Sequence, residues 1–166
     1  MKSADTEYRV LVIDDNPDIH EDFRKVLCQE RYASSQLEAM ENTIFGAPPE
    51  NPNKQRRFQV DSAHQGHEGL AKLYHALQEG EPYAMAFVDV RMPPGWDGIE
   101  VIPRLWVADP NLPIVLCTAY SDYTWEEIFA KLGNTDHLFI LKKPWERIEL
   151  LQLAHTLAER YRRRSG

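Results

Sequence analysis

Residues 83–98 of the chain read YAMAFVDVRMPPGWDG. The stretch begins with an apolar run from Tyr83 to Val88, reaches a carboxylate at Asp89, and continues into a segment rich in Pro and Gly. A short apolar run bounded by turn residues predicts a buried β-strand. Asp97 and Glu100 have the spacing of a capping pair, which predicts the start of a helix. The stretch is therefore predicted to be a strand, a loop and a helix, with Asp89 at the carboxyl end of the strand.

The same unit recurs along the chain. Four more apolar runs predict strands, at Val10–Ile13, Phe58–Ala63, Pro113–Cys117 and Leu138–Leu141. Segments with the spacing of an amphipathic helix follow these runs. Apolar strands that alternate with helices five times predict a parallel sheet covered on both faces, which is a doubly wound α/β fold.

The predicted helices have defined ends and one internal conflict. Asn16 and Pro17 suit the N-cap and the first position of a helix, and Thr124 with Glu127 has the pattern of a capping box. Pro103 predicts a kink, because a proline inside a helix removes a hydrogen bond. The predicted inward faces are Ile19, Phe23, Val26 and Leu27; Leu70, Leu73, Tyr74 and Leu77; Ile99, Ile102 and Trp106; Trp125, Ile128, Phe129 and Leu132; and Ile148, Leu151, Ala154 or His155, and Ala158.

Length and composition predict one domain over residues 1–166. Apolar residues make up 43% of the chain and charged residues 27%, which is ordinary globular composition. A helix and loop insertion is predicted at about 30–57, because its second half, GAPPENPNKQRR, holds three prolines and almost no apolar side chains. No apolar run approaches the length of a membrane span, and the N-terminus lacks a signal-peptide pattern, so we expect a cytoplasmic protein.

The charge and the cysteines exclude several other classes. A net charge of −7 disfavours direct binding to nucleic acid, and the arginines at 160 and 162–164 are interpreted as a solvated helix end. Cys28 and Cys117 do not have the pattern of a disulfide framework or a zinc site and are expected to be reduced. His64 and His67 are expected to be surface residues rather than metal ligands.

Polar residues end the apolar strands of the predicted sheet. Asp14 and Asp15 follow one strand, while Asp89, Thr118 and Lys143 follow three others. Ligands of open parallel sheets bind beyond the carboxyl ends of the strands, so these side chains should converge. Each residue alone would be read as a helix cap, a turn residue or a solvated charge, but the joint arrangement is hard to explain in this way.

A crowded group of carboxylates favours a divalent cation. Oxygen ligands of this type suit Mg²⁺, with Mn²⁺ as an alternative. With the charge neutralised, one carboxylate can attack phosphorus as a nucleophile. Lys143 would then stabilise the transferring group, and Thr118 would donate a hydrogen bond to it.

Four segments resemble the signatures of response-regulator receiver domains, the family of the bacterial chemotaxis receiver. They are VLVIDDN at 10–16, FVDVRMPPGWDG at 87–98, VLCTAY at 115–120 and ILKKP at 140–144. The resemblance implies a flavodoxin-like fold with strand order 2-1-3-4-5. It implies that Asp89 is the phosphoacceptor, Asp15 a direct Mg²⁺ ligand, and Asp14 a second acid that acts through water. The main-chain carbonyl of Arg91 would complete the metal ligands.

The resemblance also assigns roles to residues beyond the acids. Thr118 would be the switch hydroxyl and Lys143 the phosphate-pairing lysine, with a cis bond from Lys143 to Pro144. The phosphoryl donor would be a sensor histidine kinase or a phosphotransfer protein. A C-terminal output domain absent from this chain, or a homodimer, are further partners that the resemblance leaves open. No direct contact with nucleic acid or membrane is expected.

The chain departs from the family pattern near the switch. Ile140 occupies the position where many receivers hold a Tyr or Phe, and the adjacent Phe139 should point to the opposite face. Tyr120, Tyr123 and Trp125 are a candidate interface cluster, in which Tyr120 and Tyr123 are the favoured interface residues and Trp125 is equally well read as core.

Two rival functions and one kinetic hypothesis remain. We hypothesise that the side chains of Arg91 and Tyr120 hinder the water molecule that would attack a phosphoryl group on Asp89. They would thus slow self-dephosphorylation. A Mg²⁺-dependent phosphohydrolase with an aspartyl nucleophile usually carries an acid two residues beyond the nucleophile, where this chain has Arg91. A pseudo-receiver that only binds partners would be expected to lose part of the acid set, which is complete here.

Overall fold

Five parallel strands form one sheet in the computed structural model, which describes residues 6–28, 56–119, 122–133 and 135–165. The strand order is β2-β1-β3-β4-β5. This confirms the predicted fold class and the predicted order. The strands are β1 (Thr6–Ile13), β2 (Arg56–Ala63), β3 (Met85–Asp89), β4 (Ile114–Thr118) and β5 (Leu138–Lys142).

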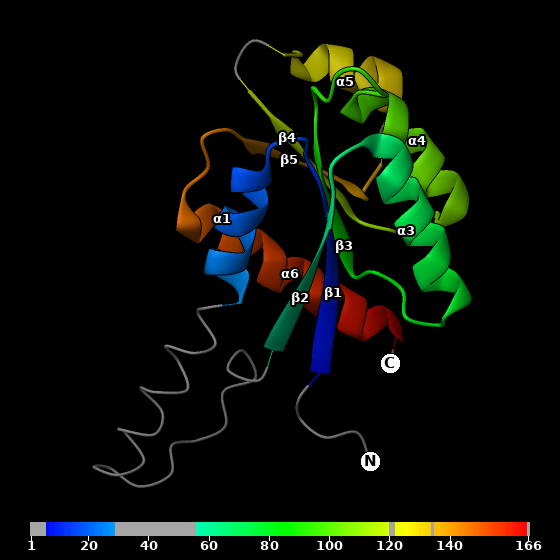
Figure 1. Ribbon diagram of the computed structural model, residues 1–166, viewed down its shortest axis with the longest axis vertical. Helices are drawn as coiled ribbons and strands as arrows, with labels where there is room; N and C mark the ends of the chain where they lie inside the picture. The colour runs from blue at the N-terminus through cyan, green and yellow to red at the C-terminus, as the bar shows by residue number, and fades with distance from the viewer. Residues whose placement is uncertain (1–5, 29–55, 120–121, 134, 166) are drawn as a thin grey trace, which may run out of the picture.

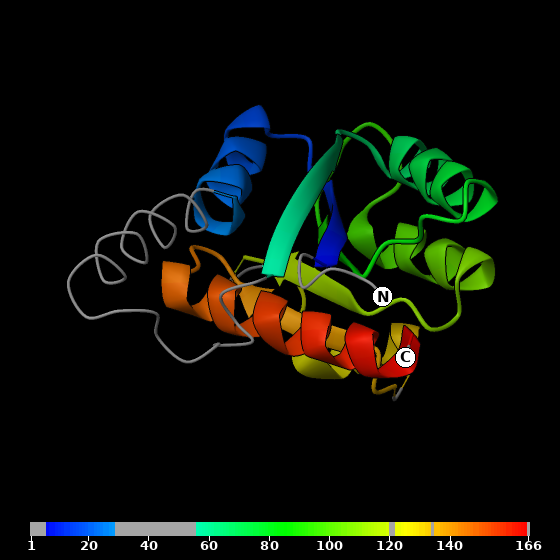
Figure 2. The same ribbon diagram turned by 90° about the horizontal axis from the view of Figure 1, so that it is seen from below.

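Helices cover both faces of the sheet (Figures 1 and 2). One face carries α1 (Pro17–Leu27) and α6 (Arg147–Ser165). The other face carries α3 (Gly66–Gln78), α4 (Gly98–Ala108) and α5 (Trp125–Leu132). The sheet is therefore wound on two sides, as the apolar strands predict.

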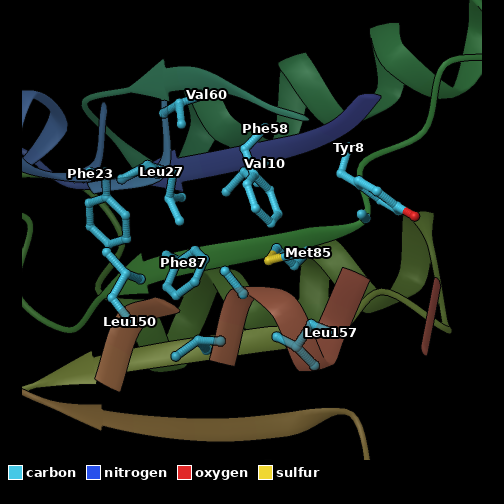
Figure 3. Close-up of a cluster of buried hydrophobic side chains, with 14 of the residues drawn as sticks. Tyr8, Val10, Phe23, Leu27, Phe58, Val60, Met85, Phe87, Leu150 and Leu157 are labelled. Carbon is cyan, nitrogen blue, oxygen red and sulfur yellow. The ribbon is translucent and has the colours of Figure 1, made fainter. Parts of the chain in front are cut away.

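Each face of β1 contributes to a different core. Val10 and Val12 pack beneath α1 and α6, whereas Leu11 and Ile13 pack beneath α3 and α4. All four side chains are buried because successive residues of a strand point to opposite faces. Figure 3 shows the first of these cores, in which the rings of Phe23 and Phe87 lie 4.9 Å apart.

Side chains cap the amino-terminal ends of three helices, as predicted. The Asn16 side chain accepts a hydrogen bond from the Asp18 amide, and Asp97 with Glu100 forms a complete capping box. The Glu127 amide donates to the Thr124 hydroxyl at 3.2 Å. Helix α4 continues through Pro103, which lies on its exposed side, and the predicted kink stays a prediction.

Glycines with left-handed backbone stop two helices. Gly80 has φ +72° and Gly133 has φ +82°, a region that other residues rarely adopt. The Gly80 amide donates to the Leu77 carbonyl and the Glu81 amide to the Ala76 carbonyl. These paired bonds satisfy carbonyls that the end of α3 would otherwise leave free.

None of the five predicted strands has the observed bounds at both ends: β1 begins at Thr6 rather than Val10, and β4 and β5 each end one residue later than predicted. Arg56 and Arg57 belong to β2 rather than to the preceding loop, since they pair with Thr6 and Glu7 of β1. Hydrogen bonds to β1 hold these polar residues in the strand, and the apolar pattern of the sequence cannot reveal such pairing. At β3 the strand starts at Met85 and includes Asp89, although Tyr83 is buried as expected.

Four predicted core side chains are exposed. Tyr74, Trp125, Phe129 and Ile148 expose 46%, 58%, 44% and 71% of their surface, which rules out the core reading of Trp125. Helix α6 instead faces the sheet with Leu150, Ala154, Leu157 and Ala158. Ile148 precedes Leu150 by two residues and so lies roughly 200° away around the helix.

Helices α3 and α5 meet their neighbours along narrower stripes than predicted. A side-chain carbon at Gly69 would lie 2.3 Å from the Ile13 side chain, so α3 lies close to β1 at this glycine, while Tyr74 is exposed. In α5 only Ile128 is buried. Trp125 and Phe129 contact each other on the outside, with ring centroids 6.3 Å apart.

The predicted helix and loop insertion lies almost entirely outside the described residues.

The cysteines are free thiols, and burial raises the pKa of Cys117 to about 12, so this thiol stays protonated. The arginines near the C-terminus lie within α6 and several are paired; Arg162 and Arg163 contact Glu159. Within the described residues no helix is long and apolar enough to cross a membrane.

Candidate phosphorylation site

Three carboxylates meet beyond the carboxyl ends of β1 and β3. Asp14 and Asp15 follow β1, and Asp89 is the last residue of the adjacent strand β3. One carboxylate oxygen from each of the three lies within 4.8 Å of the others. Asp14 is buried and Asp15 is exposed, so the group faces solvent on one side. We call these three residues the acidic edge.

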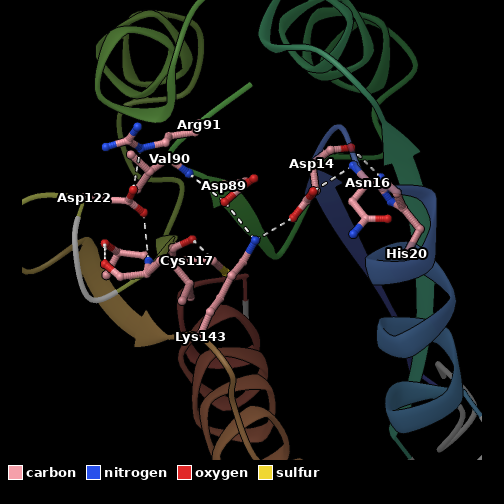
Figure 4. Close-up of polar contacts among 12 residues, drawn as sticks. Asp14, Asn16, His20, Asp89, Val90, Arg91, Cys117, Asp122 and Lys143 are labelled. Carbon is pink, nitrogen blue, oxygen red and sulfur yellow. Dashed lines mark hydrogen bonds and ion pairs between the residues drawn. The ribbon is translucent and has the colours of Figure 1, made fainter. Parts of the chain in front are cut away.

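Lys143 reaches the acidic edge from the end of β5. Its Nζ donates to Asp89 Oδ1 at 2.8 Å and to Asp14 Oδ2 at 3.1 Å, and Figure 4 shows the ammonium between the two carboxylates. The bond from Lys143 to Pro144 is cis, as predicted. The Lys143 amide donates to the Thr118 carbonyl, which anchors this residue to β4.

Burial and neighbouring charges shift both members of the central ion pair. Burial raises the pKa of Asp89, and the charge of Asp14 adds to this, while the hydrogen bond from Lys143 opposes it. Burial lowers the pKa of Lys143, but the hydrogen bond to Asp89 and the nearby carboxylates outweigh it, so the pKa is raised overall. Lys143 therefore stays charged at neutral pH.

The donor set at this edge suits a hard divalent cation. Three carboxylates face one ammonium, which leaves an excess of negative charge among half-buried oxygens. Mg²⁺ is bound in proteins by carboxylate oxygens together with water and phosphate oxygens. The residues present therefore fit such an ion.

Backbone and ring groups hold Asp14 in place. The Asn16 amide donates to Asp14 Oδ1 at 2.9 Å, and His20 Nε2 lies 2.8 Å from the Asp14 carbonyl. Burial lowers the pKa of His20, so the ring is neutral at pH 7 and donates from Nε2. Sequence reasoning missed His20. The available signal was its spacing of three residues from Phe23, which places both on one face of α1.

Asp89 and Thr118 have different local environments. Asp89 Oδ1 also accepts from the Val90 amide at 3.0 Å, so two donors orient the carboxylate. Thr118 is buried at the end of β4, beside β3. Its hydroxyl donates to the carbonyl of Ala119 at 3.1 Å. The structure therefore places Thr118 at the predicted edge with its hydroxyl engaged by its own chain.

Arg91 does not lie over Asp89. Its Nε donates to Asp122 Oδ1 at 2.5 Å, and Figure 4 shows the side chain directed away from Asp89. In this arrangement the guanidinium does not cover the carboxylate, which weakens the hypothesis of shielding by this side chain. Tyr120, the second residue of that hypothesis, lies outside the described residues.

The region around Ile140 agrees with the predicted alternation of β5. Ile140 packs with the core beneath α3, α4 and α5, whereas Phe139 packs on the opposite face with α6. Tyr123 packs against the same core as Ile140, and its hydroxyl donates to Asp97 at 3.2 Å. Of the candidate interface residues that are described, Trp125 is the more exposed.

The sequence model of the response regulator receiver domain matches residues 50–155, which is more than half of the chain. The chain belongs to the response regulator receiver domain family. Receiver domains are phosphoacceptor switches rather than conventional enzymes, bind Mg²⁺ at an acidic pocket, and interact with histidine kinases or phosphotransfer proteins. Asp14 and Asp15 precede the matched residues, and the geometry brings them to Asp89.

Curated relatives agree with this membership. The transcriptional regulatory protein TctD of Salmonella typhimurium is 38% identical over 96 residues, 58% of this chain and 39% of TctD. The uncharacterized transcriptional regulatory protein YkoG of Bacillus subtilis is 34% identical over 94 residues, 57% of this chain and 37% of YkoG. The similarity thus spans well under half of each relative.

Solved structures share the fold. A two component transcriptional regulator AraC from Clostridium phytofermentans has a TM-score of 0.65 at 18% identity, covering 96% of this chain and 98% of that one. The chemotaxis protein CheY4 of Vibrio cholerae has a TM-score of 0.59 at 18% identity, covering 92% and 99%.

Proposed function

We propose that Asp89 accepts a phosphoryl group from a phosphohistidine and that Asp14, Asp15 and Asp89 hold the Mg²⁺ this transfer requires. The observation that carries the proposal is the position of Lys143, which bridges Asp89 and Asp14 at a crowded edge of carboxylates. The main-chain carbonyl of Arg91 is proposed as a further ligand, and Mn²⁺ as an alternative ion.

The carboxylate of Asp89 is prepared to act as a nucleophile. The Val90 amide and the Lys143 ammonium both hold Oδ1 and so fix the plane of the carboxylate. In the transfer, a P–O bond to Asp89 forms while the P–N bond to the donor histidine breaks, and the histidine nitrogen keeps the electron pair. Bound Mg²⁺ would neutralise the negative charge of the carboxylates and the phosphoryl oxygens.

Lys143 and Thr118 are proposed to stabilise the phosphorylated state. The Lys143 ammonium stands 2.8 Å from Asp89, close enough to pair with a phosphoryl oxygen placed there. The Thr118 hydroxyl would have to leave the Ala119 carbonyl to donate to the phosphoryl group. This exchange of partners is the proposed first step of the switch. Because Ile140 is aliphatic, we propose that the switch proceeds without an aromatic side chain at this position of β5.

We propose that the phosphohistidine protein contacts a hollow beside Lys143. The hollow has a volume of about 500 Å³ and lies between α1 and residues 143–145, which connect β5 to α6. Its apolar wall comes from side chains including Ile19, Val26 and Trp145, and Lys143 also lines it. Ile19→Glu should slow transfer from a kinase but leave phosphorylation by acetyl phosphate unchanged.

Domain organisation and partners are proposed from family membership. We infer that residues 1–166 form one receiver domain with an insertion at about 30–57, that transfer and loss of the phosphoryl group are its only chemistry, and that it acts in the cytoplasm. The phosphorylated domain would control an output domain or another protein. A homodimer is a further arrangement open to test.

Intact mass spectrometry tests the proposed function. Incubation with Mg²⁺ and acetyl phosphate should add one phosphoryl group to the wild type and none to Asp89→Asn. A phosphoryl adduct on Asp89→Asn, or no adduct on the wild type, would overturn the assignment.

A further inference from the structure

Asp122 is a nearly buried carboxylate that the proposed chemistry does not use. Its side chain is only 6% exposed. Oδ1 accepts from Arg91 Nε at 2.5 Å, and Oδ2 accepts from the Ala119 amide at 2.8 Å. Figure 4 shows Asp122 and Arg91 on the side of Asp89 away from Asp14. Asp122 therefore holds two donors that belong to the segments following Asp89 and Thr118.

The Ala119 peptide is engaged on both sides. Its carbonyl accepts from the Thr118 hydroxyl at 3.1 Å and from the Asp122 amide at 3.2 Å. Three groups close to the carboxyl ends of β3 and β4 are thus committed to this network: the Thr118 hydroxyl, the Ala119 amide and the Arg91 guanidinium. All three are donors that an added anion would attract.

We propose that Asp122 is an internal anion that competes with a phosphoryl group on Asp89 for two of these donors, the Ala119 amide and the Arg91 guanidinium. The proposal rests on the proposed function of Asp89. Phosphorylation would place anionic oxygens beyond the ends of β3 and β4, and the donors can satisfy only one anion fully. Donors that move to the phosphoryl group must first break their hydrogen bonds to Asp122, and this cost offsets part of the free energy gained from their new hydrogen bonds. The charge of Asp122 therefore affects the free energy of the phosphorylated state.

A purely structural role for Asp122 predicts the opposite sign. If Asp122 only holds Arg91 and Ala119 in a position suited to a phosphoryl group, removing its charge should weaken the binding of a phosphoryl mimic. If Asp122 competes, removing the charge should strengthen it. Asparagine has the shape of aspartate and keeps an oxygen acceptor for the Ala119 amide, so Asp122→Asn removes the charge with little change of packing.

Beryllofluoride, an anionic mimic of a phosphoryl group, is the probe. Its dissociation constant is measured with saturating Mg²⁺ by titration for the wild type, Asp89→Asn, Asp122→Asn and Asp122→Ala. We expect binding roughly 5- to 10-fold tighter in Asp122→Asn and tighter again in Asp122→Ala, in the usual range for coupled sites. Asp136→Asn, a change at an exposed carboxylate in the segment before β5, is the matched control and should bind as the wild type does.

The outcomes separate the two proposals. If the wild type binds beryllofluoride and Asp89→Asn does not, the proposed function is supported. If Asp122→Asn then binds beryllofluoride no more tightly than the wild type, only the competition is overturned. An equal gain in Asp136→Asn also overturns it, because net charge would explain the gain. Failure of the wild type to bind overturns both.

A measurement on the wild type covers the case in which the Asp122 variants do not fold. Nuclear magnetic resonance of the Ala119 amide should show a large shift when beryllofluoride saturates the protein, as its acceptor changes from Asp122 to the added anion. An Ala119 amide that does not respond overturns the competition.

Discussion

At the carboxyl ends of the strands, Asp14 and Asp89 share the single ammonium of Lys143. Toward the amino end of the sheet, the carboxylate of Glu159 in α6 contacts guanidinium groups of Arg56, Arg162 and Arg163. We call the second group the arginine clamp. Negative charge is in excess in the first cluster and positive charge in the second.

The two clusters shift a carboxylate pKa in opposite directions. The pKa of Asp89 is raised, chiefly by burial and despite the hydrogen bond from Lys143. The pKa of Glu159 is lowered to about 2, chiefly by its hydrogen bond to Arg162. A carboxylate with too little positive charge around it is prepared to bind a cation or react, whereas one surrounded by cations is held as part of the structure.

Replacing Lys143 gives the largest expected effect. Lys143→Met should slow phosphorylation of Asp89 by acetyl phosphate roughly 10²- to 10³-fold, since it removes a preorganised cation from the reacting group. The rate is measured by intact mass at fixed Mg²⁺. Lys142→Met, at the exposed neighbouring position, should leave the rate unchanged, and equal losses in both variants would contradict the role of Lys143.

Replacing Arg56 tests the other cluster. Arg56→Met should lower the free energy of unfolding by about 1–3 kcal/mol, the usual range when hydrogen bonds to a charged group are lost. Phosphorylation of Asp89 should not change. Arg163→Met removes a more exposed partner of the same carboxylate and should cost less than about 1 kcal/mol in urea unfolding. A slower phosphorylation in Arg56→Met would show that the two clusters are coupled.

The stability of Asp89→Asn without Mg²⁺ should depend on pH. Because folding raises the pKa of Asp89, its carboxyl group stabilises the folded wild type fully below the ordinary pKa of about 3.9. This stabilisation is lost as the pH rises through the folded-state pKa. The amide of Asp89→Asn stays neutral, so this variant does not lose the stabilisation as the pH rises. It should therefore be more stable than the wild type at pH 7 and equal to it in acid. Urea unfolding from pH 3 to pH 7 measures the difference. A less stable variant at pH 7 would contradict the account of this cluster.

Glu159 should show the opposite dependence and the smallest effect. A lowered pKa contributes stability above the ordinary value of about 4.3, and this is lost as pH falls toward 2. The wild type should therefore be more stable than Glu159→Gln near neutral pH, and the gap should close in acid. The gap should also shrink in high salt, because the charges of Arg162 and Arg163 are exposed and therefore screened. A gap that is constant from pH 2 to pH 6 would disprove this.

Much of the sheet and of the acidic edge could be predicted from the sequence. Each apolar run in β1, β3, β4 and β5 ends at a polar residue, and parallel topology brings these ends together. Asp14, Asp89 and Lys143 therefore meet although 129 positions separate Asp14 from Lys143. The alternation of β5 also correctly separated Phe139 from Ile140.

Features that depend on contacts between distant segments could not be predicted in this way. The phase of α6 is fixed by its contact with the sheet, so Leu150 is buried and Ile148 exposed although both are apolar. Arg56 enters β2 because β1 pairs with it. Asp122 has no distinguishing pattern in the sequence, and its significance follows from its contacts with Arg91 and Ala119.

The most direct test of the central claim identifies the residue that carries the phosphoryl group. After incubation with Mg²⁺ and acetyl phosphate, borohydride reduces an aspartyl phosphate to homoserine, and peptide mass spectrometry locates the change. The account predicts conversion at Asp89 and at no other aspartate. Conversion at Asp14 or Asp15, or conversion that proceeds equally without Mg²⁺, would contradict it.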